Sequence, residues 1–149
     1  MNLLAPVSSI MTTDLITVNP KDKLAVIKSI FDQNRIHHIP VVRFRKLIGL
    51  ISHVDLQYFL KGLSKNNYED VLNEIRLKNY FAEDIMTTGL ATLAPSDRIN
   101  IALAVFNENR FHAIPIVEND ALVGMLTTYD IIKALSREKV SLEDYRKVG

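Results

Sequence analysis

The chain has 149 residues, with 18 lysines and arginines against 17 aspartates and glutamates, and it has no cysteine. Balanced charge disfavours a nucleic-acid role, because no field of one sign attracts phosphate backbones. The lack of cysteine excludes disulfides and thiolate metal sites and fits a reducing compartment, so we expect a cytoplasmic protein. No stretch has the apolar length that spans a bilayer, and the first residues lack a secretory pattern, so neither membrane insertion nor export is expected.

The main feature of the sequence is an internal repeat. Residues 10–55 align with residues 85–130 at a constant offset of 75 without a gap, and 18 of the 46 aligned pairs are identical. Self-similarity at a fixed offset indicates two copies of one structural unit. Each copy is too thin to fold comfortably alone, so the two are expected to pack together.

Each copy predicts the element order β-α-β-β-α. A short strand runs into Pro20 or Pro95, and an amphipathic helix follows, with apolar residues at three- and four-residue spacing. A hairpin of two buried strands and a second helix complete the copy. The expected elements are strands at 15–18, 39–42 and 47–51 and helices at 24–31 and 54–62, then strands at 90–93, 114–117 and 122–126 and helices at 99–106 and 129–137.

The segments outside the copies also carry patterns. Residues 64–79 place Val71, Leu72, Ile75 and Leu77 among polar residues, which favours a connecting helix over a disordered tether. The tail from Ser141 predicts one short terminal helix. The predicted organisation is a first repeat at 7–62, a connecting helix at 63–80, a second repeat at 81–137 and a tail at 138–149, in the α/β (α+β) class.

The repeat carries three motifs: an Ile-Met-Thr-Thr opening, a His-x-Ile-Pro strand, and a glycine followed by Ser/Thr-x-x-Asp at a strand end. Together they resemble the cystathionine β-synthase (CBS) domain, and two in tandem resemble the CBS pair called a Bateman module. The resemblance covers almost the whole chain. It implies repeats related by a pseudo-twofold axis, homodimers, and adenosyl compounds bound between the repeats. It also implies a free-standing pair that acts on an unidentified protein in trans and requires no cofactor.

The Ser/Thr-x-x-Asp motifs are the strongest candidate sites. Ser52 with Asp55, and Thr127 with Asp130, fall where a strand meets a helix. A carboxylate accepts two hydrogen bonds from the adjacent hydroxyls of a ribose, and free N–H groups at a helix start suit phosphate. The same pattern is a capping box, which closes the N-terminus of any helix. The resemblance implies that both aspartates hold ribose.

The resemblance also implies that each site combines the Asp motif of one repeat with the opening strand and the pre-proline residues of the other. Apolar members of these sets suit the faces of a purine, although ordinary core is the alternative. One set is Leu15, Ile16, Ile36, His37 and His38 with Thr127, Tyr129 and Asp130; the other is Leu90, Ala91, Phe111, His112 and Ala113 with Ser52, Val54 and Asp55.

The histidines are expected to distinguish the two sites. His37 and His38 suit a phosphate, because a protonated imidazole forms charge-assisted hydrogen bonds. Ala113 replaces the second histidine in the other copy. We therefore expect the set with His37, His38, Thr127 and Asp130 to be the better nucleotide site. Adjacent histidines on an extended chain point to opposite faces, so a metal site is not expected.

Three functions remain open. No phosphate-binding loop, zinc-protease helix or nucleophile elbow is present, so an enzyme is disfavoured. The leading interpretation is a regulatory sensor of AMP, ADP, ATP or a related ligand such as S-adenosylmethionine. The alternative is an interaction or dimerisation platform without a physiological nucleotide. The weakest is single-stranded nucleic-acid binding at Arg43, Phe44, Arg45 and Lys46.

Overall fold

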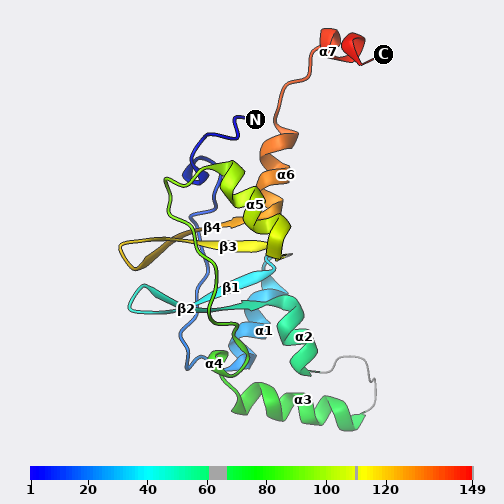
Figure 1. Ribbon diagram of the computed structural model, residues 1–149. Coiled ribbons are helices and arrows are strands. Elements are labelled where there is room, and N and C mark those ends of the chain that lie inside the picture. The colour runs from blue at the N-terminus through cyan, green and yellow to red at the C-terminus, as the bar shows by residue number, and fades with distance from the viewer. Residues whose placement is uncertain (61–66, 110, 149) are drawn as a thin grey trace.

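The structure of the chain is a computed structural model that describes residues 1–60, 67–109 and 111–148. It contains two similar halves, one built on α1, β1, β2 and α2 and the other on α5, β3, β4 and α6 (Figure 1). The predicted α+β class is confirmed. The elements are η1 (Val7–Ser9), α1 (Leu24–Gln33), β1 (His38–Arg43), β2 (Lys46–Ser52), α2 (His53–Leu60), α3 (Asn67–Asn79), α4 (Ala82–Ile85), α5 (Ile99–Asn109), β3 (Ala113–Glu118), β4 (Ala121–Thr127), α6 (Thr128–Ser136) and α7 (Leu142–Lys147).

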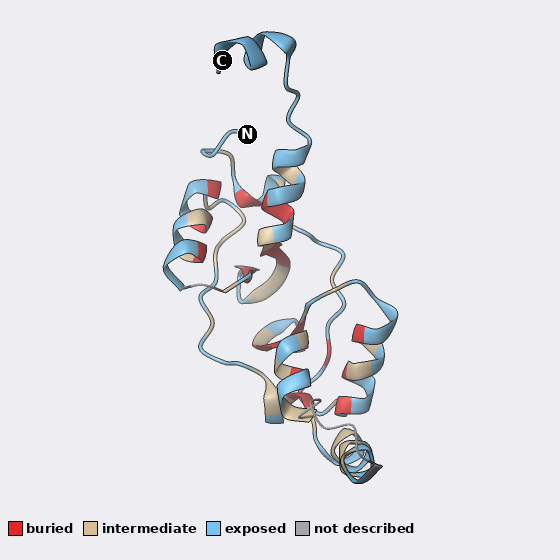
Figure 2. Ribbon diagram, turned by 90° about the vertical axis from the view of Figure 1, so that its right-hand side faces the viewer, coloured by how far each residue is buried: buried red, intermediate tan, exposed pale blue. Residues whose placement is uncertain are grey.

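The two hairpins confirm the predicted central strands. β1 pairs antiparallel with β2, and β3 with β4, and each pair has an irregularity at the same place, after Val41 and after Ile116. Their apolar residues Ile39, Ile51, Ile114 and Leu126 are fully buried beneath the flanking helices, whose buried positions face inward in Figure 2. Residues 39–41, 49–51, 113–116 and 124–126 are buried in succession, so both faces of each hairpin are covered, and this burial fixes the register.

The predicted opening strands are wrong as regular strands. Only Val18 and Leu93 pair, each through a single parallel bridge, to Val41 and Ile116. The Val18 N–H donates to the Pro40 carbonyl at 3.0 Å, and the Val18 carbonyl accepts from Val42 at 2.9 Å. Pro20 follows two residues later, and a proline cannot donate to a strand ladder, so the pairing stops there.

The halves exchange their first residues. Val7 is fully buried in the core of the second half, and its N–H donates to the Asp97 carbonyl at 2.7 Å. Ala82 is fully buried in the core of the first half, and its N–H donates to the Asp22 carbonyl at 2.8 Å. Each core therefore contains a segment from both repeats, which explains how two thin units form one stable body.

Two pairs of reciprocal backbone hydrogen bonds join the opening segment of each repeat to a strand of the other repeat. Leu50 and Thr87 bond each other through both backbone groups, at 3.0 and 2.9 Å, and Thr12 and Met125 do the same at 2.9 Å. A Cβ on Gly49 would lie 2.6 Å from the sulfur of Met86, and one on Gly124 would lie 2.7 Å from the sulfur of Met11. The repeated glycines therefore leave space for the repeated methionines.

The outer helices complete the chain. The connecting helix is confirmed in its described part, where α3 contacts α1. The predicted residues 61–66 at the end of α2 and before α3 lie outside the described residues. The terminal helix α7 begins at a Ser141 capping box, as expected, and stands apart from the body (Figure 1). No helix among the described residues is long and apolar enough to cross a membrane.

Candidate functional site

The first Ser/Thr-x-x-Asp motif begins α2. The Ser52 N–H donates to Asp55 Oδ2 at 2.9 Å, and the Asp55 N–H donates to Ser52 Oγ at 3.0 Å. This is a capping box, so the capping interpretation is confirmed here. Asp55 is half-buried, and its other oxygen, Oδ1, accepts no hydrogen bond from any residue that the structure describes.

The second motif begins α6 and has more partners. Asp130 Oδ2 accepts from the Thr127 N–H and the Thr127 hydroxyl, both at 2.8 Å. Asp130 Oδ1 accepts from the Thr12 hydroxyl at 2.9 Å, and the residue is only 7% exposed. Both oxygens of this carboxylate are therefore used inside the protein, whereas Asp55 keeps one available.

The pre-proline residues lie beside the motif of their own repeat. His38 pairs with Ser52 across the hairpin, and the His53 N–H donates to the His37 carbonyl at 2.8 Å. In the other half Ala113 pairs with Thr127, and the Thr128 N–H donates to the His112 carbonyl at 3.0 Å. The expectation that these residues join the motif of the other repeat is therefore wrong for His37, His38 and Ala113, because the β1–β2 and β3–β4 hairpins hold them to their own. His112 is held in the same way but also lies near His38 of the other repeat.

The opening segments do come from the other repeat. Thr87 bonds Leu50 just before the Asp55 motif, and Thr12 bonds both Met125 and Asp130. The structure thus forms two sets of residues. The Asp55 site contains Ile36, His37, His38, Ser52, Val54 and Asp55 with Thr87 of the other repeat, and the Asp130 site contains Phe111, His112, Ala113, Thr127, Tyr129 and Asp130 with Thr12 of the other repeat.

The predicted apolar residues have different surroundings. Val54 and Tyr129 are 70% and 67% exposed at the starts of their helices, and Ile16 is 38% exposed. In contrast, Ile36 packs against the first core, and the Phe111 ring lies 6.5 Å from that of Phe106. Leu15 and Leu90 pack where Leu50, Ala113 and Met125 meet between the repeats, and Ala91 is exposed. Core packing is therefore the observed role of Ile36, Phe111, Leu15 and Leu90.

Three histidines interact electrostatically near Asp55. Burial lowers the pKa of His38 below its usual value of 6.5, and the nearby imidazoles of His37 and His112 lower it further, while the Asp55 carboxylate opposes them. His112 thus approaches from the other repeat. His37 and His112 are exposed. Three imidazoles with one partly free carboxylate provide hydrogen-bond donors for an anion and an acceptor for hydroxyl groups.

One surface hollow distinguishes the helix starts. In the first half the His53 ring packs on Phe31, with ring centres 5.1 Å apart. Thr128 takes the place of His53 in the second half, and there a shallow hollow of about 480 Å³ opens. Its lining residues are Leu103, Phe106, Asn107, Phe111, His112 and Thr128. The hollow therefore lies where the His53 ring packs in the first half, although Phe106 is buried about as fully as Phe31.

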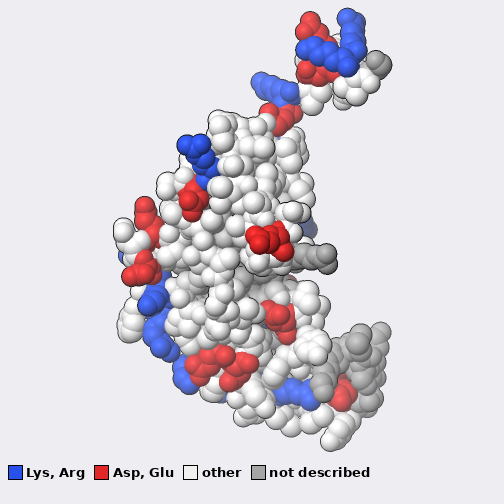
Figure 3. Space-filling view, in the orientation of Figure 1, with Lys and Arg blue, Asp and Glu red and all other residues white. Residues whose placement is uncertain are grey.

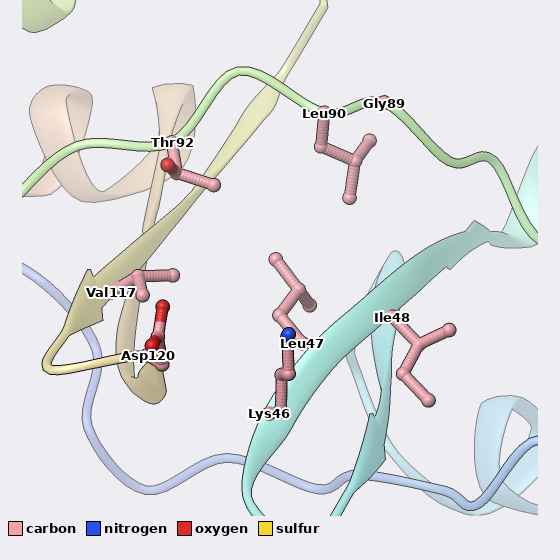
Figure 4. A pocket seen from close by; sticks show the side chains of 8 residues that line it. All are labelled: Lys46, Leu47, Ile48, Gly89, Leu90, Thr92, Val117 and Asp120. Carbon is pink, nitrogen blue, oxygen red and sulfur yellow. The ribbon is translucent and has the colours of Figure 1, made fainter.

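A second pocket lies at the opposite end of the strands, between the hairpins (Figure 4). Its volume is about 200 Å³. The lining residues are Lys46, Leu47, Ile48, Gly89, Leu90, Thr92, Val117 and Asp120. Of these residues, Leu90 was predicted in a nucleotide site and Lys46 in the nucleic-acid-binding alternative. The opposite charges of the two hairpin turns were the available signal, but only the fold places the turns together.

Comparison with known proteins identifies the family of the chain. The CBS domain profile matches residues 7–62 and 82–137, so the chain belongs to the CBS domain family. An inosine-5'-monophosphate dehydrogenase of Thermoplasma acidophilum is 26% identical over 125 residues, a match that covers 83% of this chain. This match spans only 22% of the length of the dehydrogenase.

Solved structures agree with this assignment. CBSX2 of Arabidopsis thaliana, solved in complex with AMP, is 23% identical with a TM-score of 0.73 and is matched over 89% of this chain and 97% of that one. The CBS domain pair of MJ0100, in complex with 5'-methylthioadenosine and S-adenosyl-L-methionine, is 20% identical with a TM-score of 0.73, over 90% and 98%. The predicted tandem CBS fold is confirmed.

Proposed function

We propose that the chain is a regulatory module that binds a phosphorylated adenosine compound, such as AMP, at the Asp55 site. The observation that carries this proposal is Oδ1 of Asp55, which accepts no hydrogen bond from a described residue and belongs to a carboxylate that acts on the His38 imidazole. A ribose needs a carboxylate acceptor, and a phosphate needs donors close to it. The exposed Val54 beside Asp55 supplies apolar surface for the base.

The ligand class is supported by relatives and by charge. CBSX2 was solved with AMP, and the MJ0100 pair with two adenosyl sulfur compounds. The histidine group favours the phosphorylated class, because a phosphate stabilises protonated imidazoles while the positive sulfonium of S-adenosylmethionine opposes them. We therefore rank AMP, ADP and ATP above S-adenosylmethionine.

The proposal reverses the expected ranking of the two sites. Thr12 and Thr127 already satisfy the Asp130 carboxylate, which is nearly buried. A ribose at Asp130 meets a nearly buried carboxylate that already accepts three protein hydrogen bonds, whereas Asp55 accepts one from the described residues and is half-buried. One nucleotide per chain, at Asp55, is the proposed stoichiometry.

We further propose a homodimer without enzymatic activity that acts on a separate protein. Helix α6 presents Tyr129, Ile132 and Leu135 at 67%, 61% and 52% exposure, a large apolar area for one helix face. Exposed apolar area of this kind favours association. Sedimentation velocity with and without AMP measures the assembly, and a monomer in both conditions would contradict the homodimer.

The ligand proposal is tested by calorimetric titration of AMP, ADP, ATP and S-adenosylmethionine into the purified protein. We expect the phosphorylated compounds to bind more tightly than adenosine, because imidazole N–H groups donate hydrogen bonds to phosphate. Adenosine, which has no phosphate, is the control. Absence of binding by every compound at millimolar concentration would leave the interaction platform as the better account.

A further inference from the structure

The pocket between the hairpins has opposite charges in its lining. Lys46 begins β2, and Asp120 lies in the turn between β3 and β4. Figure 4 shows the Lys46 amine and the Asp120 carboxylate on either side of a space that Leu47 and Leu90 border. Neither charge forms an ion pair with a residue in the described ranges.

The wider charge pattern strengthens this polarity. The turn between β1 and β2 and the strand residues that flank it carry Arg43, Arg45 and Lys46, whereas the equivalent part of the second hairpin carries Glu118 and Asp120. Positive and negative atoms adjoin along the edge of the molecule where the turns lie (Figure 3). A small molecule in the pocket therefore meets a positive side and a negative side.

The corresponding place across the pseudo-twofold axis is built differently. There the Leu122 N–H donates to the Arg45 carbonyl at 2.9 Å, which joins β4 to the turn of the first hairpin. The equivalent bond, from Leu47 to Asp120, is absent among the described residues. Ala121 and Arg45 also stand in place of Lys46 and Asp120. The open, oppositely charged arrangement therefore belongs to one side of the molecule.

The size and lining of the pocket restrict its occupant. A volume of about 200 Å³ is below the range of roughly 300–1,000 Å³ typical of sites for drug-sized ligands. Leu47, Leu90 and Val117 supply apolar surface. The hydroxyl of Thr92 adds a polar group without a partner among the described residues. The pocket thus combines one cation, one anion and a short apolar wall.

We propose that this pocket binds an α-amino acid with an aliphatic side chain, such as leucine. The ligand carboxylate lies on Lys46, the ligand ammonium lies on Asp120, and the side chain contacts Leu47, Leu90 and Val117. Hydrogen bonds between ionised groups are stronger than those between neutral groups, so the carboxylate and the ammonium of the ligand both contribute to binding. The site is separate from Asp55, at the other end of β2, and the chain therefore takes two different small molecules.

The test is a calorimetric titration with L-leucine, 4-methylpentanoate, which lacks the ammonium, and 3-methylbutylamine, which lacks the carboxylate. We expect leucine to bind about tenfold more tightly than either analogue, since a hydrogen bond to a charged group contributes enough for such a factor. Lys46→Gln should weaken leucine and 4-methylpentanoate but leave 3-methylbutylamine unchanged. Asp120→Asn should weaken leucine and 3-methylbutylamine but leave 4-methylpentanoate unchanged.

The variants are chosen to preserve the fold. Asp120 has a φ of 62°, and asparagine also adopts this left-handed conformation readily. Arg43→Gln is the matched control, because it removes a cation of the same hairpin that does not line the pocket. Circular dichroism confirms that each variant is folded before titration.

Three results would overturn the proposal: no leucine binding at millimolar concentration, leucine binding that survives both Lys46→Gln and Asp120→Asn, or competition between leucine and AMP. The last result would make the pocket part of the nucleotide site. AMP titrated into the same two variants separates the proposals, because the Asp55 site should be unaffected by them. Leucine binding without AMP binding would contradict the nucleotide proposal alone.

Discussion

The Thr12 hydroxyl donates a hydrogen bond to Oδ1 of Asp130 at 2.9 Å, across 118 positions of sequence. Thr87 is the equivalent of Thr12, yet no such bond joins it to Asp55 in the described part of the chain. The two sites therefore differ despite nearly identical motifs: Asp130 accepts from the hydroxyls of Thr12 and Thr127, whereas neither Thr87 nor Ser52 donates its hydroxyl to Asp55 among the described residues. One carboxylate joins the repeats together, and the other remains available.

Removal of the Thr12 hydroxyl tests this difference. Thr12→Val leaves a nearly buried carboxylate without one partner, so the free energy of unfolding should fall by about 1–2 kcal/mol. Thr87→Val is the matched control and should change it by less than about 0.5 kcal/mol. Urea denaturation measures both. Equal effects of the two substitutions would contradict the asymmetry.

The contact between glycine and methionine makes a second prediction. Gly49→Ala places a Cβ 2.6 Å from the Met86 sulfur, and such overpacking costs about 1–3 kcal/mol of stability. Met86→Ala in the same chain removes the sulfur and Cγ contacts and keeps only the Cβ contact at 3.0 Å, so the double variant should be more stable than the sum of the two single effects implies. A double-mutant cycle measured by denaturation decides this, and strict additivity would contradict the contact.

The titration of His38 predicts a pH dependence. Burial lowers its pKa in the folded protein, and the neighbouring His37 and His112 lower it further against the opposing effect of Asp55. The unfolded chain therefore binds this proton more readily, and stability should fall as the pH drops through and below about 6.5. His38→Gln should reduce this loss. Denaturation curves at pH 7.5 and 5.5 test it, and an unchanged pH dependence would be the contrary result.

The first hairpin turn places Phe44 and Arg45 in a left-handed backbone conformation that these residue types do not favour. Phe44 and Arg45 have φ values of 49° and 69°, and the equivalent Asn119 and Asp120 have 50° and 62°. Phe44 is 95% exposed, so its ring adds no packing to offset the strain. Phe44→Asn with Arg45→Gly should raise stability by about 1–2 kcal/mol, because asparagine and glycine suit this turn.

The second hairpin provides the reciprocal control for the turn. Asn119→Phe should destabilise the chain by a similar amount, since it introduces the same strain at the equivalent place. Thermal unfolding of both variants checks the pair. A first-hairpin variant that is less stable than the parent would show that Phe44 or Arg45 has a contact that outweighs its backbone strain.

Local patterns predicted much of the fold, and their limits are specific. The spacing of Leu24, Ile27 and Phe31 predicted α1 correctly, because one buried helix face needs only nearby residues. The burial of Val7 in the second core and Ala82 in the first depends on contacts between distant segments. The glycine and methionine that recur in each repeat were a sequence signal of these distant contacts. The structure shows why they recur, because each glycine leaves space for the methionine of the other repeat.

The candidate sites also have some features that adjacent residues predict and others that depend on distant contacts. The capping role of Asp55 and Asp130 follows from adjacent residues and was predictable. The grouping of the histidines was not, because it depends on which hairpin holds His37 and His38 next to Ser52. Thr12 was missed for the same reason, since its partner is brought to it by the exchange between repeats.

The most direct test of the proposed function compares two matched variants. AMP is titrated calorimetrically into the parent, Asp55→Asn and Asp130→Asn, after circular dichroism has confirmed that each is folded. We predict one AMP per chain in the parent, at least about tenfold weaker binding in Asp55→Asn, and nearly unchanged affinity in Asp130→Asn. Loss of AMP binding in Asp130→Asn with retention in Asp55→Asn would contradict the account.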